Sequence, residues 1–167
     1  MPPPRYELDS VVTQSVLDRL IDREPHEQAE AAMTRAQSVR ALKASLRRDL
    51  EWLLNTRRNP EPAGAEFPEA AASLYNYGFT DFSSFSLSNP KDRLRLLRSL
   101  EQTIETFEPR LMAVRVVMFD RENNDLDRAV RFQIEGLLKM DPAPEQITFD
   151  TVLSLTSGEY QIKGDKG

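Results

Sequence analysis

The chain has 167 residues, 40% hydrophobic and 29% charged, which suits one soluble globular domain with a real core. Its net charge of -5 does not favour nucleic acid as a partner, and the absence of cysteine excludes disulfides, thiol catalysis and thiolate metal sites. We expect no membrane insertion, because every apolar run is shorter than the roughly 20 residues of a spanning helix. We expect no secretory signal either, because residues 1–10 contain no apolar segment.

The N-terminal region divides into a short amphipathic element and a polar stretch. Residues 15–22, SVLDRLID, carry apolar side chains at helical spacing, but a helix this short is not stable alone and must dock on the core or on a partner. Residues 23–37 are polar and alanine-rich, which is typical of a linker that can be partly helical. We therefore predict an N-terminal extension over residues 1–37 and a single α+β domain over residues 38–167.

The strongest helical pattern begins near Ser38 and ends before Pro60. Its apolar face consists of Val39, Leu42, Leu46, Leu50 and Leu53, at steps of three and four residues. Between residues 38 and 58, six basic residues stand against Asp49 and Glu51, a local excess of four positive charges, since 6 − 2 = 4. Either this is a solvated helix face or it is a docking surface for an acidic partner.

Residues 59–90 form a long segment rich in proline, glycine, serine and aromatic residues. A loop of this length in a small domain is more often functional than idle. Five aromatic residues fall between Tyr75 and Phe85. Either they pack over the edge of the core, or they present an aromatic patch to a partner.

A second helix follows, capped by Ser88 or Asn89 with Pro90 in its first turn and ended by Pro109. The spacing predicts a buried stripe of Leu94, Leu97, Leu100, Ile104 and Phe107.

The hydrophobic period then changes from that of a helix to that of strands. We predict strands over residues 111–120, 129–136, 146–155 and 159–164, the first of them covered on both faces because it is apolar on both alternations. The predicted fold class is α+β, with N-terminal helices packed on one face of a small, mainly antiparallel sheet of three to four strands.

The residues offer little for catalysis or for cofactor binding. His26 is the single histidine and lies in the polar linker, so a catalytic triad or a histidine metal site has almost nothing to build on. The acidic turn at 120–131 fails as a calcium loop, because Asp125 and Arg131 stand where glycine and a bidentate acid are needed. No glycine pattern fits a phosphate cradle. We predict no catalytic, cofactor or metal site.

The most informative short stretch is FEPRL, residues 107–111, at the change from helix to strand. In an extended backbone Glu108 and Arg110 point to the same side, and Pro109 makes the corner rigid. The pair can be an internal ion pair or a charged contact for a partner. Use of Glu108 as an active-site acid is the weakest alternative, because nothing in the sequence indicates a second carboxylate across an apolar cleft.

Nearly the whole chain resembles the TssE family of type VI secretion systems, which is similar to the lysozyme-related baseplate wedge protein of contractile-tail phages. The resemblance rests on SVLDRLID, SVRALKASLRRDLEWLLNTRR, LYNYGFTDFSS, FEPRL, VRFQIEGLL and ITFDTVLSLTSGEYQI. It implies a structural subunit of a cytoplasmic baseplate docked at the inner membrane, in wedges with TssF and TssG and near TssK. It also implies that the protein seeds assembly of the TssB and TssC sheath by strand pairing, and that Glu108, Pro109 and Arg110 hold the helical core bundle of the wedge.

Two other functions stay open at this level. The family's lysozyme label suggests a peptidoglycan hydrolase, and a small regulatory adaptor of the same fold is also possible. If the charged corner serves partners, alanine at position 108 or 110 is expected to weaken association with TssF and TssG and to leave the isolated fold intact.

Overall fold

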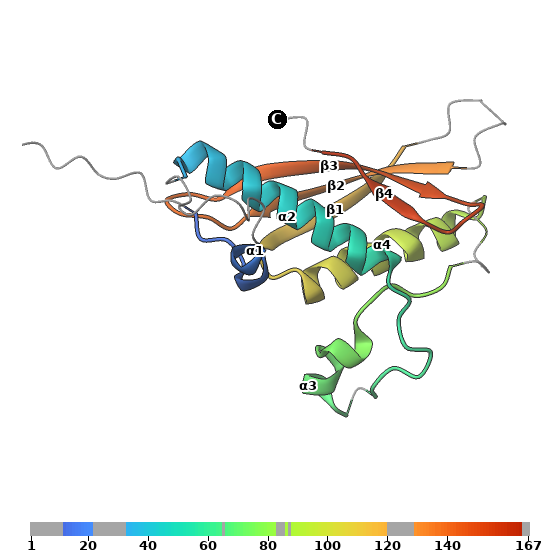
Figure 1. The fold of residues 1–167 in the computed structure, drawn as a ribbon. Helices are drawn as coiled ribbons and strands as arrows, with labels where there is room; N and C mark the ends of the chain where they lie inside the picture. The colour runs from blue at the N-terminus through green and yellow to red at the C-terminus, as the bar shows by residue number, and fades with distance from the viewer. Residues whose placement is uncertain are drawn as a thin grey trace, which may run out of the picture.

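The computed structural model describes residues 12–21, 33–64, 66–82, 86, 88–119 and 129–164. It has two long helices on one face of a four-stranded antiparallel sheet, with short helices at two places on the periphery (Figure 1). The elements are α1 (Val16–Leu20), α2 (Arg35–Asn55), α3 (Pro68–Ala71), the 3₁₀ helix η1 (Leu74–Asn76), α4 (Pro90–Phe107), β1 (Leu111–Met118), β2 (Ala129–Leu138), β3 (Glu145–Ser154) and β4 (Tyr160–Ile162). The α+β prediction is confirmed.

The two long helices begin where side chains can satisfy their free amides. Thr34 and Gln37 form a reciprocal capping box, so α2 begins at Arg35, three residues before the predicted start. Asn89 caps α4 and Pro90 occupies its first turn, as the sequence predicts. The predicted domain division after residue 37 therefore falls within α2, and residues 22–32 lie outside the described part of the chain.

The buried stripe of α4 differs from the predicted one at its start. Leu100 and Ile104 are fully buried, but Leu94 is 55% exposed and Leu96 takes its place in the core at 1% exposure. Leu96, Leu100 and Ile104 lie on one face of α4 at steps of four residues, and α4 packs against β1.

The sheet runs in the order β1-β2-β3-β4 with every neighbour antiparallel. Helix α4 lies against β1 and α2 against β4, and the core forms between these helices and one sheet face. The prediction that the first strand is covered on both faces is wrong. Val117 is 37% and Phe119 48% exposed, because both long helices lie on the opposite face (Figure 1).

The aromatic segment mostly packs at the end of α2. Phe79 is buried, with its ring 4.7 Å from that of Phe82 and 5.7 Å from that of Tyr160. Tyr75, in contrast, is 53% exposed, and Phe85 lies outside the described residues. The first alternative for this segment therefore holds for Phe79 and Phe82, whereas Tyr75 faces solvent.

Candidate functional site

The corner between α4 and β1 is held by backbone hydrogen bonds on both sides of Pro109. The Glu108 amide closes the last turn of α4 by donating to the Ile104 carbonyl at 2.8 Å, and the Leu111 amide donates to the Glu108 carbonyl at 3.1 Å. Lys139, which follows β2, donates its amide to the Arg110 carbonyl and its Nζ to the Pro109 carbonyl, at 2.8 and 2.7 Å. The path of the chain through the corner is therefore fixed.

At this corner, Glu108 and Arg110 are bonded to each other. Arg110 donates Nε to Oε1 and Nη2 to Oε2 of Glu108, at 2.6 and 2.5 Å, in the forked geometry that suits guanidinium and carboxylate. Only 4% of Glu108 is exposed. The internal ion pair, one of the two main alternatives from the sequence, is therefore present in the isolated chain.

The same guanidinium also reaches helix α2. Its Nη2 lies 2.7 Å from Oδ2 of Asp49, and its Nη1 lies 3.4 Å from Oγ of Ser45. Arg110 thus joins three elements, because Glu108 ends α4, Arg110 precedes β1 and Asp49 belongs to α2. An arginine can do this with one side chain, because its five donors point in several directions.

The chain of charges continues from α2 to α1. Arg48 donates Nε and Nη2 to Oδ1 of Asp49, and its Nη1 to Oδ1 of Asp18 at 2.7 Å. Oδ2 of Asp18 accepts from the Ser15 hydroxyl at 2.5 Å, and only 8% of Asp18 is exposed. Asp18, Arg48, Asp49, Arg110 and Glu108 form an alternating series, which we call the charge network.

The network shifts the pKa values of Arg110 and Asp18, and also that of the neighbouring Tyr77. Burial acts to lower the pKa of Arg110, but the hydrogen bonds and charges of Glu108 and Asp49 raise it well above its usual value. Burial acts to raise the pKa of Asp18, but hydrogen bonds from Ser15 and Arg48 and the charge of Arg48 lower it. Burial, with the charges of Asp49 and Glu108, raises the pKa of Tyr77. Asp18 is thus stabilised as an anion beside the guanidinium of Arg48.

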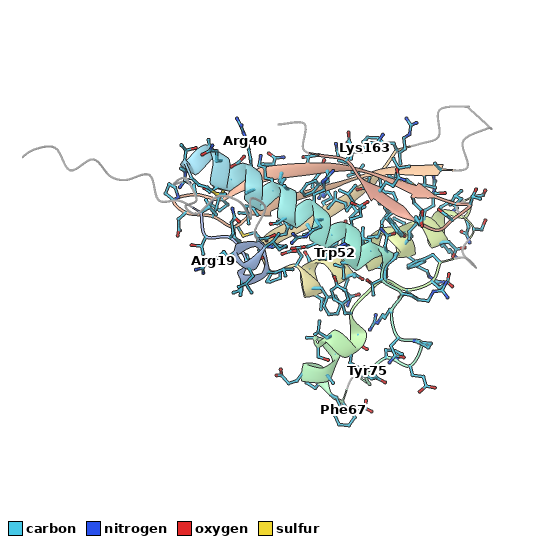
Figure 2. The ribbon with its side chains drawn as sticks, in the orientation of Figure 1. Arg19, Arg40, Trp52, Phe67, Tyr75 and Lys163 are labelled. Carbon is cyan, nitrogen blue, oxygen red and sulfur yellow. The ribbon has the colours of Figure 1, made fainter. Side chains whose placement is uncertain are left out.

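The exposed flank of the network is apolar and aromatic. The Arg48 guanidinium carbon lies 4.9 Å from the ring centroid of Trp52, which is 52% exposed (Figure 2). Helix α1 turns Asp18 inward and its apolar residues outward, since Val16 and Leu20 are 71% and 76% exposed. The predicted amphipathic element is therefore held on the core by Asp18, not by its apolar face.

Sequence reasoning identified Glu108, Pro109 and Arg110 but missed Asp18, Arg48 and Asp49. Asp49 contacts Arg110 from 61 positions away, and Asp18 contacts Arg48 from 30 positions away. Neither pairing has a local signature. Some basic residues of the predicted basic face of α2 form ion pairs within the protein, since Arg48 lies in the network and Lys43 bonds Glu145 at 2.8 Å. Arg40 and Arg47 on the same helix are exposed.

Other residues that the sequence singled out lie elsewhere. His26 and most of the acidic turn, residues 120–128, fall outside the described part of the chain. Among the described residues, no group of three or more histidine, aspartate or glutamate side chains could hold a metal ion. Within the same residues, none of the helices is both long and apolar enough to cross a membrane.

Fold and site together define a small α+β protein whose most highly organised polar feature is a rigid ion-paired corner. The family model described as baseplate wedge protein gp25 matches residues 40–143, so the chain belongs to that family, which includes TssE. No curated protein and no solved structure matched the chain. The matched range contains the whole corner from Asp49 to Arg110, and it ends before β3.

Membership of this family indicates the general role of the protein. It is a baseplate wedge component, and such a component works by contacts with other baseplate proteins. The charge network is a feature that such contacts could use, because it holds charged side chains in place before any partner binds.

The lowered pKa of Asp18 leads to a pH-dependent prediction for Asp18→Asn. Because folding lowers this pKa from its usual 3.8, the ionised carboxylate stabilises the fold at neutral pH, and that contribution is lost as the pH falls below about 4. Urea unfolding at pH 7 should show a loss of about 1–3 kcal/mol for the variant, and the difference from the parent should shrink by pH 3. The exposed Glu105→Gln is the control, and an equal deficit for Asp18→Asn at both pH values would contradict the assignment.

Proposed function

We propose that this chain is the TssE-type subunit of a type VI secretion baseplate, a structural protein and not an enzyme. In this proposal it works in the cytoplasm at the inner membrane, joins TssF and TssG near TssK, and helps to start the TssB and TssC sheath. The observation that carries the proposal is the rigid corner at Glu108–Pro109–Arg110, in a chain that belongs to a baseplate wedge family.

Within the corner, the three residues differ in what they can offer a partner. Pro109 is exposed and 24% of the Arg110 side chain is exposed, whereas the Glu108 side chain is only 6% exposed. We therefore assign contact with the wedge helices to Pro109 and Arg110. Glu108 acts through Arg110, by holding the guanidinium in one orientation so that a partner does not have to order it.

The geometry of Glu108 argues against the hydrolase alternative. A general acid must carry a proton and reach the substrate. Both oxygens of Glu108 accept hydrogen bonds from Arg110, and the residue is almost completely buried. A carboxylate bonded in this way is well suited to hold an arginine and poorly suited to donate a proton to a polysaccharide.

The proposed division into an N-terminal extension and a domain concerns the polar bonds that join residues 12–21 to α2. Within the predicted extension, residues 12–21 are bonded to α2 through Asp18 and Arg48 and through the Val12 amide, which donates to the Ser38 hydroxyl at 3.2 Å. We propose that the extension docks on the domain that follows it through these polar bonds.

Both outer strands of the sheet carry side-chain caps that oppose simple strand addition. On β1, the Phe119 amide donates to the Arg131 carbonyl of β2. Because amides alternate in direction along a strand, the Val116 amide points away from β2. There it donates to Oε1 of Glu101 at 2.9 Å. On β4, Tyr160 turns its outer amide and carbonyl to the Asn55 side chain, at 2.8 and 2.9 Å. Such caps protect edges that would otherwise pair with another chain.

The first half of β3 has no such cap among the described residues. Its pairing on the β4 side ends at Asp150, whose carbonyl accepts from the Lys163 amide at 2.8 Å. Because alternate residues face the same edge, Gln146 and Thr148 turn their amides and carbonyls to that side. We propose that a strand of the sheath adds here, in line with β4, through main-chain hydrogen bonds.

The corner is tested by co-purification of Arg110→Ala and Arg110→Lys with TssF and TssG. Both variants should retain less of the two partners, because lysine keeps the charge but lacks the guanidinium fork. Arg95→Ala is the control, since 73% of that arginine side chain is exposed on α4. Arg110→Ala also leaves the buried Glu108 unpaired, so thermal unfolding must show that the protein is folded at the working temperature. Folded variants that retain both partners in full would contradict the assignment.

Thr148→Pro tests the open edge of β3. Proline removes the amide donor at position 148, while the odd-numbered residues keep the ladder to β2, so the sheet should tolerate the change. Thr148→Val is the matched control because it keeps the donor. Assembly of fluorescently labelled TssB in cells should fall with proline and persist with valine; normal assembly with a folded proline variant would place the contact elsewhere.

A further inference from the structure

A compact segment projects from the body of the protein at the end of α2. It spans residues 59–77, and its two short helices, α3 and η1, lie away from the sheet and both long helices (Figure 1). We call it the α3 lobe. Its root is closed by a parallel bridge between Arg57 and Phe79, in which the Phe79 amide donates to the Thr56 carbonyl at 2.7 Å. At this root Gly78 has φ +108°, and a Cβ there would lie 2.5 Å from the Thr56 carbonyl oxygen.

Polar bonds give the α3 lobe its internal order. Asn76 is fully buried; its Nδ2 donates to the Ala71 carbonyl, and its Oδ1 accepts from the Ala63 amide, both at 3.1 Å. Ser73 caps η1 through its hydroxyl. In the described part of the lobe, Asn76 is the only residue of α3 and η1 that is buried.

The large apolar side chains of the lobe face solvent. Leu74 is 84%, Phe67 61% and Tyr75 53% exposed, and Figure 2 places Phe67 and Tyr75 at the end of the lobe farthest from the sheet. An ordered lobe that keeps its polar residue inside and its aromatic residues outside does not gain stability from those aromatic residues. Exposed aromatic anchors on a preorganised segment are instead typical of the centre of a protein interface.

Charge defines the kind of surface that the lobe fits. Residues 59–77 contain Glu61, Glu66 and Glu69 and no lysine, arginine or histidine, which gives the lobe a charge of -3. Glu66 and Glu69 are exposed on either side of Phe67 in the sequence. The complementary surface is an apolar groove whose rim carries lysine or arginine.

We propose that the α3 lobe is a docking knob, which inserts Phe67, Leu74 and Tyr75 into a basic-rimmed apolar groove on another baseplate protein. Its root adjoins the charged corner, because the rings of Tyr77 and Phe107 meet edge to face at 5.4 Å and Phe107 precedes Glu108. One partner surface can therefore span both the knob and the corner. The knob rests on its own shape and charge, and it does not depend on which secretion or phage system the baseplate serves.

The test places a photo-crosslinking phenylalanine derivative at position 74 of the full chain in cells that assemble the baseplate. A second chain carries the same probe at position 94, where the leucine is 55% exposed on α4. The probe at position 74 should form an adduct with a segment of another protein that combines apolar residues with lysine or arginine, and the probe at position 94 should not. Charge reversal by Glu66→Lys with Glu69→Lys should lower that adduct by about ten-fold.

The lobe variants must keep the circular dichroism spectrum and the thermal unfolding of the parent. A second variant, Leu74→Ser with Tyr75→Ser, removes two apolar contacts of the knob and leaves its charges intact. Equal adducts at positions 74 and 94, an adduct with an acidic segment, or an adduct that survives both sets of changes would overturn the proposal. An adduct with a second copy of this chain would also overturn it. If the adduct forms with a protein of a phage tail and not of a secretion system, the knob stands while the secretion assignment fails.

Discussion

The structure depends on the position of one guanidinium, that of Arg110. It is shared between Glu108 at the end of α4 and Asp49 in the middle of α2, so it joins the helix layer at the point where the chain enters the sheet. A largely buried arginine is tolerated only when its charge and its donors are satisfied, and this requirement fixes both acids. Because Arg48 engages the same Asp49, α1 is attached to the core through the same series of charges.

This arrangement changes how the corner is understood. A charged motif at the surface can be an isolated contact point, but here Glu108 is buried beneath the arginine that it holds. Replacing Glu108 is therefore expected to destabilise the fold as well as to disturb any interface, whereas the sequence alone predicts that alanine leaves the isolated fold intact. The helices also protect the sheet, since Glu101 caps the Val116 amide on β1 and Asn55 caps Tyr160 on β4. No such cap lies on the first half of β3 among the described residues.

Periodicity and local chemistry predicted much of this fold. The caps and proline signals placed α4 from Pro90 to Phe107, and two-residue spacing placed Glu108 and Arg110 together. Two kinds of feature were not predicted from the sequence. Which faces are covered depends on packing between elements, so Leu94 and the outer face of β1 were assigned wrongly. Long-range ion pairs, such as that of Asp49 with Arg110, have no local signal in a single sequence.

The most direct test of the central claim is a double-mutant cycle on Arg110 and Glu108, with Arg110→Met, Glu108→Gln and the combined variant. The free energy of unfolding is measured by urea for all four proteins. If the pair holds the corner, each single change removes at least one of the two hydrogen bonds and the charge pairing from a buried partner. The combined loss should then be smaller than the sum of the single losses by about 1–3 kcal/mol. Losses that add to within about 0.5 kcal/mol would contradict the claim, because the two side chains would then act independently.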